Sequence, residues 1–360
     1  MGGGNMKLFA LDLGNRQVKL KSEKDTKVLP TYFVDVEEYG KRDVLVLKDT
    51  NKKTSDYVSH RDSDFTYVWG EDLRISGKHL MDTIRFNNRY NSTEFKLLAD
   101  FALAELARDF KESRSGVLDV VVVTGVPTND YDNEDVVGNL IKALKGVHSV
   151  DIDGKTHVVR VHNVYVLMQP TGTAINEMVD GNGELIDDTD IEDGYIGVVD
   201  CGGGTLIIDA FDAMNLDTKN RVQLKDGAYS LYTSIRNKVS NYEISEHEVE
   251  RVVRNGSEDE LYVWSPNGRE HIDLTSIVMK ERKRYTLKVI QSIGTTYKDI
   301  GRMKAIYFTG GGANLLLQEE IEDAFPIFRF VKNSELANLN GFYKYGLLNE
   351  VTSDGDEITD

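Results

Sequence analysis

The residues of this sequence best suited to chemistry lie in a glycine-rich stretch near its centre. An apolar run ends at Asp200 and Cys201, three glycines follow at 202–204, and Thr205 precedes a second apolar run. This pattern predicts a hairpin whose glycines let backbone N–H groups converge on an anion such as phosphate. Asp200, beside the turn, is suited to hold the hydrated Mg²⁺ that accompanies phosphate. The alternative is a glycine-rich hairpin with an incidental aspartate.

Two further turns of this kind follow apolar strands. Asp12-Leu13-Gly14 ends the first apolar run, and a return strand follows in which Val18 and Leu20 alternate with polar residues. A glycine triplet at 310–312 follows the apolar run at 305–308. A single glycine triplet is weak evidence, whereas three such turns in this order are strong evidence for a phosphate site. The repeated strand-turn-strand unit predicts two similar domains that face each other across a cleft.

The elements expected around these turns alternate between strands and helices, which indicates an α/β protein. Before the central hairpin we expect short strands at 44–47 and 67–69, a helix from 91 to 110, a buried strand at 118–123, a helix at 133–145, a hairpin turning at 153–154, and a strand from 164 that leads into a helix near Pro170. After it we expect helices at 230–238, 245–254, 275–298 and 340–348. A length of 360 residues allows two domains with separate cores.

The composition limits the classes of partner. The formal net charge is −17, from 43 basic and 60 acidic side chains, so direct binding to DNA or to an anionic membrane is disfavoured. Contact with DNA would therefore require a basic partner. The sequence has no apolar run long enough to span a membrane and no signal-peptide pattern, so we expect a soluble cytoplasmic protein. We expect flexible ends at 1–5 and 351–360.

Cys201 is the only cysteine of the chain, which excludes an internal disulfide and a cysteine-based metal cluster. Its place beside the central turn raises the alternative of a nucleophilic thiol. No histidine lies near it in the sequence to act as a base, which argues against that role.

Together, the three turns resemble the nucleotide-binding fingerprint of the actin, heat-shock chaperone and sugar kinase superfamily, from Met6 to about Leu348. The resemblance implies an actin-like, ribonuclease H-like α/β fold of duplicated domains facing each other across a nucleotide cleft. It places domain I at 6–165 plus 332–350 and domain II at 166–331.

The resemblance also implies the residues of a nucleotide site. The β- and γ-phosphates would be gripped from both domains, and the third turn would lie beside the adenosine. The expected contacts are Asp12, Gly14, Asn15, Lys19, Gly202, Gly203, Gly204, Thr205, Gly310, Gly311 and Gly312. Asp12 and Asp200 would hold Mg²⁺ through water. Arg16 departs from the small residue common at its position, and for Lys19 the alternative is a solvated strand lysine.

The stretch that begins at Gln169 resembles the hinge helix whose leading glutamine or glutamate positions the attacking water. An amide cannot act as a strong base, so Gln169 would orient water by hydrogen bonding while Asp200 acts with the metal, and hydrolysis would be slow. The alternative is a helix-capping glutamine. Gly341 and Gly346 lie in what resembles the second hinge helix, where small residues permit a close crossing.

Four local strings, at 67–73, 89–96, 123–127 and 341–345, are similar to plasmid-segregating actins of the ParM type from Gram-positive plasmids. This resemblance implies a filament that hydrolyses ATP or GTP with Mg²⁺ and pushes plasmid copies apart. A small basic adaptor bound to centromere-like DNA would recruit it, without direct nucleic-acid or membrane binding by the filament. Two alternatives remain on the same fold: a non-polymerising small-molecule kinase or hydrolase, and a nucleotide-gated binding module.

Overall fold

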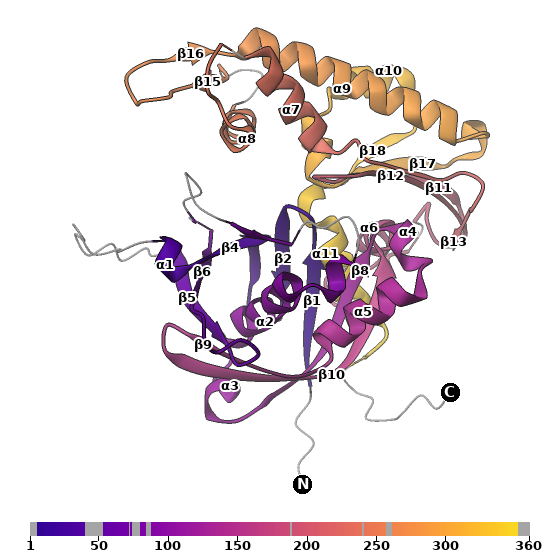
Figure 1. The fold of residues 1–360 in the computed structure, drawn as a ribbon. Helices are drawn as coiled ribbons and strands as arrows, with labels where there is room; N and C mark the ends of the chain where they lie inside the picture. The colour runs from indigo at the N-terminus through magenta and orange to yellow at the C-terminus, as the bar shows by residue number, and fades with distance from the viewer. Residues whose placement is uncertain are drawn as a thin grey trace. The chain divides into compact units, whose positions relative to one another are not determined.

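The computed structural model describes residues 6–39, 53–71, 73, 80–83, 88–187, 189–239, 241–256 and 261–351. The expected strand at 44–47 and the expected flexible ends, apart from Val351, lie outside this range. The chain forms two compact units: unit 1 comprises Met1–Asp187 and Asn338–Asp360, and unit 2 comprises Asp188–Ala337 (Figure 1).

Unit 1 is built on a large mixed sheet. Its central strand β1 (Lys7–Leu13) pairs antiparallel with β2 (Gln17–Lys21) and parallel with β8 (Leu118–Val126), which pairs parallel with β10 (Lys155–Met168). The remaining strands are β3 (Thr26–Pro30) on the β2 side, and β9 (Gly146–Ile152), β5 (Thr54–Ser59), β6 (Tyr67–Gly70), β4 (Tyr32–Asp35) and β7 (Met81–Asp82) beyond β10.

Unit 2 repeats the centre of this arrangement. Strand β11 (Tyr195–Cys201) pairs antiparallel with β12 (Leu206–Asp212) and parallel with β17 (Ala305–Thr309), which pairs parallel with β18 (Phe328–Phe330). Short strands β13 (Asn215–Leu216) and β14 (Val222–Leu224) extend the β12 side, and β15 (Val263–Trp264) with β16 (Ile272–Asp273) forms a separate ribbon. An antiparallel hairpin followed by two parallel strands thus occurs in both units, so the predicted duplication is confirmed.

Helices cover these sheets, and the expected helices are present. Unit 1 has α1 (Val36–Tyr39), η1 (Arg89–Asn91), α2 (Thr93–Ala107), α3 (Glu112–Ser115), α4 (Thr128–Tyr131), α5 (Glu134–Leu144), α6 (Gln169–Met178) and α11 (Ala337–Leu348). Unit 2 has α7 (Ala228–Lys238), α8 (Glu246–Asn255), α9 (Thr275–Thr296), η2 (Ile300–Arg302), η3 (Gly311–Leu315), α10 (Gln318–Ala324) and η4 (Ser334–Leu336). Ser92 caps α2 by accepting a hydrogen bond from the Phe95 N–H. Among the described residues, no helix combines the length and apolar composition that crossing a bilayer requires.

The first domain boundary lies later than expected. Position 165/166 falls inside β10, which stays paired with β8 as far as Met168 and continues directly into α6. Strand pairing therefore holds this segment in unit 1, and the structure divides after Asp187. The return segment likewise begins at Asn338 rather than at 332.

Helices α6 and α11 of unit 1 cross at glycines. A Cβ atom on Gly341 would overlap the carbonyl oxygen of Gly172 and lie 2.8 Å from its Cα, and a Cβ on Gly346 would lie 2.6 Å from Leu8 Cδ1. The backbone of α6 leaves no room for a side chain at Gly341, whereas at Gly346 the neighbour is the side chain of Leu8 on β1. The expected close crossing of the two helices is present at Gly341, and Gly346 packs on strand β1 instead.

Asp100 on α2 is the centre of a buried polar network and gives a prediction about pH. Its carboxylate lies 2.7 Å from His148 Nδ1 and accepts hydrogen bonds from Ser59 Oγ (2.6 Å) and Arg61 Nε (3.0 Å). Burial raises the pKa of Asp100, but the hydrogen bonds from His148 and Arg61 outweigh burial, so the pKa is lowered. A lowered folded-state pKa means that this stabilisation is complete above the unfolded value of about 3.9 and is lost as the pH falls through the folded value.

We therefore expect Asp100→Asn to lower the free energy of unfolding by about 2 kcal/mol at neutral pH and by less in acid. Urea unfolding at a series of pH values measures both effects. A difference between the two proteins that stays constant as the pH falls would contradict the prediction.

Candidate functional site

The first Asp-Gly turn, in unit 1, brings together three of the predicted residues. Asp12 is 2 % exposed near the end of β1, and Lys19 lies opposite it on β2, with its Nζ 3.0 Å from Asp12 Oδ2. Gln169 Nε2 donates to Asp12 Oδ1 over 3.4 Å. A buried carboxylate, a cation and an amide therefore meet beside the turn that contains Gly14 and Asn15.

These contacts argue against two alternative roles, a solvated lysine at position 19 and a helix-capping glutamine at position 169. The side chain of Lys19 is 13 % exposed and ion-paired, so it is not a solvated strand lysine. Gln169 is the first residue of α6, and the N-cap residue is Met168, which makes no side-chain cap. The Gln169 amide contacts Asp12 instead.

The second turn, in unit 2, is fixed by the start of a helix. The Gly202 N–H donates to the Thr205 carbonyl (2.8 Å), which closes the turn. The N–H groups of Ala228 and Tyr229, at the start of α7, donate to the carbonyls of Gly202 (3.0 Å) and Gly203 (2.9 Å). The turn containing Gly202–Thr205 is thereby held from the side on which its carbonyls lie.

Gly227 was not among the predicted site residues, yet this arrangement requires it. A Cβ on Gly227 would lie 2.6 Å from the Gly202 carbonyl oxygen, so a larger residue would push α7 away from the turn. The glycine precedes α7 in the sequence, but only the contact with a turn 25 residues earlier shows what it does.

The third turn packs against the strand that carries Asp200. Asp200 is 4 % exposed on β11, opposite Thr309 on β17. Gly310 has φ +81°, and a Cβ there would overlap Asp200 Oδ1 and the carbonyl oxygen of Cys201. A Cβ on Gly312 would lie 2.8 Å from that same oxygen. The structure thus brings the predicted residues 200–205 and 310–312 together in unit 2, where glycine is needed for both close approach and backbone conformation.

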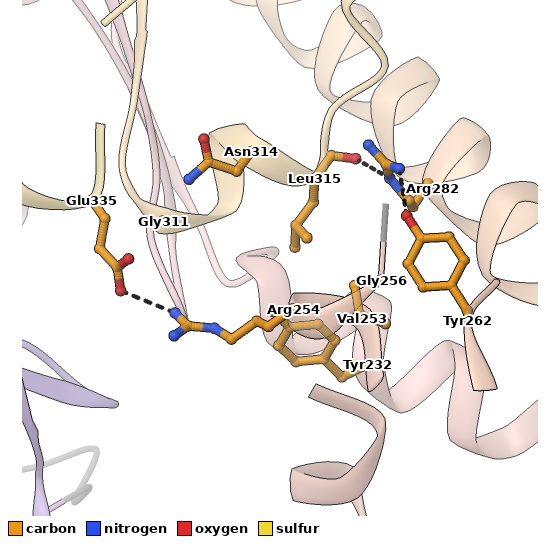
Figure 2. Close-up of a pocket in the computed structure, with 10 residues that line it drawn as sticks. All are labelled: Tyr232, Val253, Arg254, Gly256, Tyr262, Arg282, Gly311, Asn314, Leu315 and Glu335. Carbon is orange, nitrogen blue, oxygen red and sulfur yellow. Dashed lines mark hydrogen bonds and ion pairs between the residues drawn. The ribbon is translucent and has the colours of Figure 1, made fainter. Parts of the chain in front are cut away.

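A pocket of about 500 Å³ opens beside the third turn and lies wholly within unit 2 (Figure 2). Figure 2 shows Arg254 extending toward Glu335 below Gly311, with an Nη2–Oε1 distance of 3.0 Å. On another wall, Arg282 donates to the Leu315 carbonyl (3.0 Å) and the Tyr262 hydroxyl (2.9 Å). The lining residues are Tyr232, Val253, Arg254, Gly256, Tyr262, Arg282, Gly311, Asn314, Leu315 and Glu335.

The pocket combines aromatic surface with a fixed charge. Burial raises the pKa of Tyr232 to about 12, so its hydroxyl is neutral. Burial lowers the pKa of Arg254, but the carboxylates of Glu335 and Glu250 outweigh burial and raise it. Apart from Gly311, this lining has no signal in the sequence, because its residues come from five separate elements, α7, α8, α9, η3 and η4, and from the connection between α8 and β15. A pocket of this size and chemistry suits a nucleoside.

Cys201 is not a nucleophile. It is fully buried in the core of unit 2, and burial raises the pKa of its thiol. Because the thiolate is the reactive form, we expect Cys201 in the native protein to react with a disulfide reagent such as Ellman's far more slowly than in guanidinium chloride. Release of the coloured thiolate measures the rate. An equal rate in both solvents would contradict the buried position.

The carboxylates fit a metal held through water. Among the described residues, no group of three or more histidine, cysteine, aspartate and glutamate side chains could bind a metal ion alone. Asp12 and Asp200 are single buried carboxylates next to the glycine-containing turns. Magnesium, which keeps several waters and takes its other oxygen ligands from phosphate, suits such positions.

The comparisons with known proteins cover most of the chain. Residues 10–172 match the family model for the N-terminal domain of actin-like proteins, and residues 195–326 match the Alp7A C-terminal domain. No curated protein matches the sequence significantly.

Solved structures match along the whole chain. The apo psk41 ParM protein is 25% identical, covers 98% of this chain and 100% of its own, and has a TM-score of 0.74. An archaeal actin homologue in complex with ADP is 16% identical (95% and 99% covered, TM-score 0.73). ParM from a 15-stranded filament of Clostridium botulinum is 16% identical (95% and 99% covered, TM-score 0.74). The predicted actin-like fold and the predicted family are confirmed: this chain belongs to the actin-like proteins of the ParM type.

Proposed function

We propose that this protein is a nucleotide-dependent filament that hydrolyses ATP or GTP and drives plasmid segregation. The observation that carries the proposal is the duplicated turn: in each unit a buried aspartate, Asp12 or Asp200, stands two residues before a glycine at the end of the central strand. Two such turns suit the two ends of a metal-bound polyphosphate. The ADP bound to the archaeal homologue and the filament of the C. botulinum ParM are consistent with this proposal.

Each predicted residue has a role in this proposal. Gly14 and Asn15 in unit 1, and Gly203, Gly204 and Thr205 in unit 2, offer backbone or hydroxyl groups to the β- and γ-phosphates, and Lys19 adds a cation. Gly202, whose N–H is donated to the Thr205 carbonyl, keeps the turn closed and leaves space for the phosphates. Gly310, Gly311 and Gly312 leave room for the nucleoside in the unit 2 pocket. Magnesium, when bound, neutralises phosphate charge, and Asp12 and Asp200 hold its waters.

Gln169 orients the attacking water. Its amide already makes a hydrogen bond at Asp12, on the phosphate-turn side of unit 1. Because an amide accepts and donates hydrogen bonds but is no strong base, it positions the water without deprotonating it, and hydrolysis is slow. Slow hydrolysis suits a filament that must persist before it disassembles.

We expect Gln169→Ala to lower the hydrolysis rate by about 100-fold, as misplacement of a reacting group does. Gln318→Ala is the matched control, since Gln318 is the first residue of α10 as Gln169 is of α6. Phosphate release at saturating nucleotide measures both variants. Equal rates for Gln169→Ala and the control would remove the catalytic role from Gln169.

The net charge of −17 determines how such a filament reaches DNA. An acidic surface repels the phosphate backbone, so we propose that a basic DNA-binding adaptor, bound at a centromere-like plasmid site, links the filament to its cargo. Direct binding to nucleic acid or to an anionic membrane has no place in this proposal.

Sedimentation and light scattering of the purified protein test the function. The protein is incubated with Mg²⁺ and ATP, GTP, ADP, GDP or no nucleotide, and phosphate release is followed in parallel. We expect assembly only with a triphosphate and disassembly as phosphate is released. A particle that stays small at high protein concentration yet binds nucleotide would contradict the filament and indicate a kinase or a nucleotide-gated module.

A further inference from the structure

Arg89 holds the backbone of the first turn. From η1 it donates through Nη2 to the carbonyl oxygens of Leu13 (2.9 Å) and Gly14 (2.6 Å). Its guanidinium group lies 5.6 Å from the ring centre of Tyr90 and 5.3 Å from that of Phe95. Aromatic contacts of this kind orient a guanidinium group and limit its movement. A fixed positive charge therefore lies against the carbonyl side of the turn.

Thr31 holds the next two peptide groups of the same turn. Its Oγ1 donates to the carbonyl oxygen of Asn15 (3.1 Å), and its backbone N–H donates to that of Arg16 (3.3 Å). Thr31 lies between β3 and β4 and is 1 % exposed. Four consecutive carbonyl groups, from residue 13 to residue 16, are therefore engaged by two residues that are distant in sequence.

A hydrogen bond that fixes a carbonyl group also fixes the direction of the N–H group in the same peptide. In a planar trans peptide, the C=O of one residue and the N–H of the next point in opposite directions. The N–H groups of Gly14 and Asn15 are therefore directed away from Arg89, and that of Arg16 is directed away from Thr31. We propose that Arg89 and Thr31 are positioning residues that preorganise the N–H groups of this turn for phosphate.

In the second turn, other groups hold the carbonyls. There the N–H groups of Ala228 and Tyr229, at the start of α7, hold the carbonyls of Gly202 and Gly203. Each turn is followed directly by a strand, β2 or β12, and in unit 1 Arg89 and Thr31 supply the donors that the start of α7 supplies in unit 2. The inference rests on the proposed nucleotide binding, and it assigns the orientation of the unit 1 turn to two residues outside the phosphate-binding fingerprint.

Thr31→Val gives the most direct test, because it removes the hydroxyl and keeps the size and branching of the side chain. We expect it to weaken ATP binding in the presence of Mg²⁺ by about fivefold, and Arg89→Met to weaken it by at least about tenfold. Thr31→Ser and Arg89→Lys, which keep a donor, should recover most of the affinity. If the protein prefers GTP, the same series is run with GTP.

Thr124→Val is the matched control. Thr124 on β8 is also fully buried, and its Oγ1 donates to the carbonyl of Leu11 (2.7 Å), which lies in strand β1 before the turn. We expect it to lower the melting temperature about as much as Thr31→Val does and to leave ATP affinity unchanged. Calorimetric titration with ATP, ADP and adenosine, beside thermal unfolding, gives both quantities. Adenosine binding should be equal in all variants, because adenosine has no phosphate.

The outcomes separate the two proposals. A wild-type protein that binds neither ATP nor GTP would overturn the proposed function. A wild-type protein that binds ATP, with Thr31→Val binding it equally well, would overturn the positioning role alone. Equal losses of ATP affinity in Thr31→Val and Thr124→Val would also overturn it, because the effect would then follow stability rather than the turn. If Arg89→Met does not fold, Thr31→Val decides the question.

Discussion

Alanine at Gly341 is expected to lower the free energy of unfolding of unit 1 by about 3 kcal/mol, the upper end of the usual range for overpacking. The added Cβ would overlap the carbonyl oxygen of Gly172, where α6 and α11 cross. A flexible side chain can move away from such a contact, but the backbone of a packed helix cannot. The two helices have no free space beside this contact either. The ring of Phe342 on α11 lies 2.6 Å from where a Cβ on Gly172 would be.

Gly138→Ala is the control for Gly341→Ala. Gly138 is also inside a helix, α5, but nothing lies within 4 Å of where its Cβ would be. Alanine there should stabilise the protein by up to about 1 kcal/mol through helix propensity. Thermal and urea unfolding of both variants compare the two positions. If both substitutions stabilise the protein, the result would contradict the absence of space for a Cβ where α6 and α11 cross.

Asp200→Asn is expected to lower Mg²⁺-dependent hydrolysis by about 100-fold or more, as loss of a preorganised electrostatic contact does. The substitution keeps the shape of a buried side chain of β11 that lies against Gly310, but it removes the charge that would hold the waters of Mg²⁺. The variant should lose assembly driven by triphosphate as well as hydrolysis. In the proposed function, both activities need the metal-bound phosphates to contact the turn of unit 2.

The matched control for Asp200→Asn is Asp209→Asn. Asp209 is a fully buried carboxylate on the neighbouring strand β12, and it lies 3.5 Å from Arg221 Nε. Its loss should lower stability and leave hydrolysis per folded molecule unchanged. Phosphate release is measured against Mg²⁺ concentration, with adenosine binding as a check on the unit 2 pocket. An Asp200→Asn protein with the wild-type rate and Mg²⁺ dependence would refute the metal role.

Much of the fold could be predicted because its signals are local. An apolar run that ends in an aspartate and a glycine reports a strand and a turn without knowledge of any distant segment, and this holds for Asp12 and Asp200 alike. Helix α2 was predictable for the same reason, since Ser92 caps it and apolar residues recur along it. The repetition of one strand-turn-strand unit then indicated a duplicated fold, which the equivalent sheets of the two units confirm.

The sequence by itself determined the three turns, their order and the family, because each depends on neighbouring residues. Only the tertiary structure decided what surrounds them. The contact of Arg89 with Gly14 joins residues 75 positions apart, and the pairing of β10 with β8 as far as Met168 keeps that segment in unit 1. Gly227 and the lining of the unit 2 pocket follow from how α7, α8 and α9 pack. Such contacts are fixed by the packing of distant segments, and no local pattern of residue types records which segments will meet.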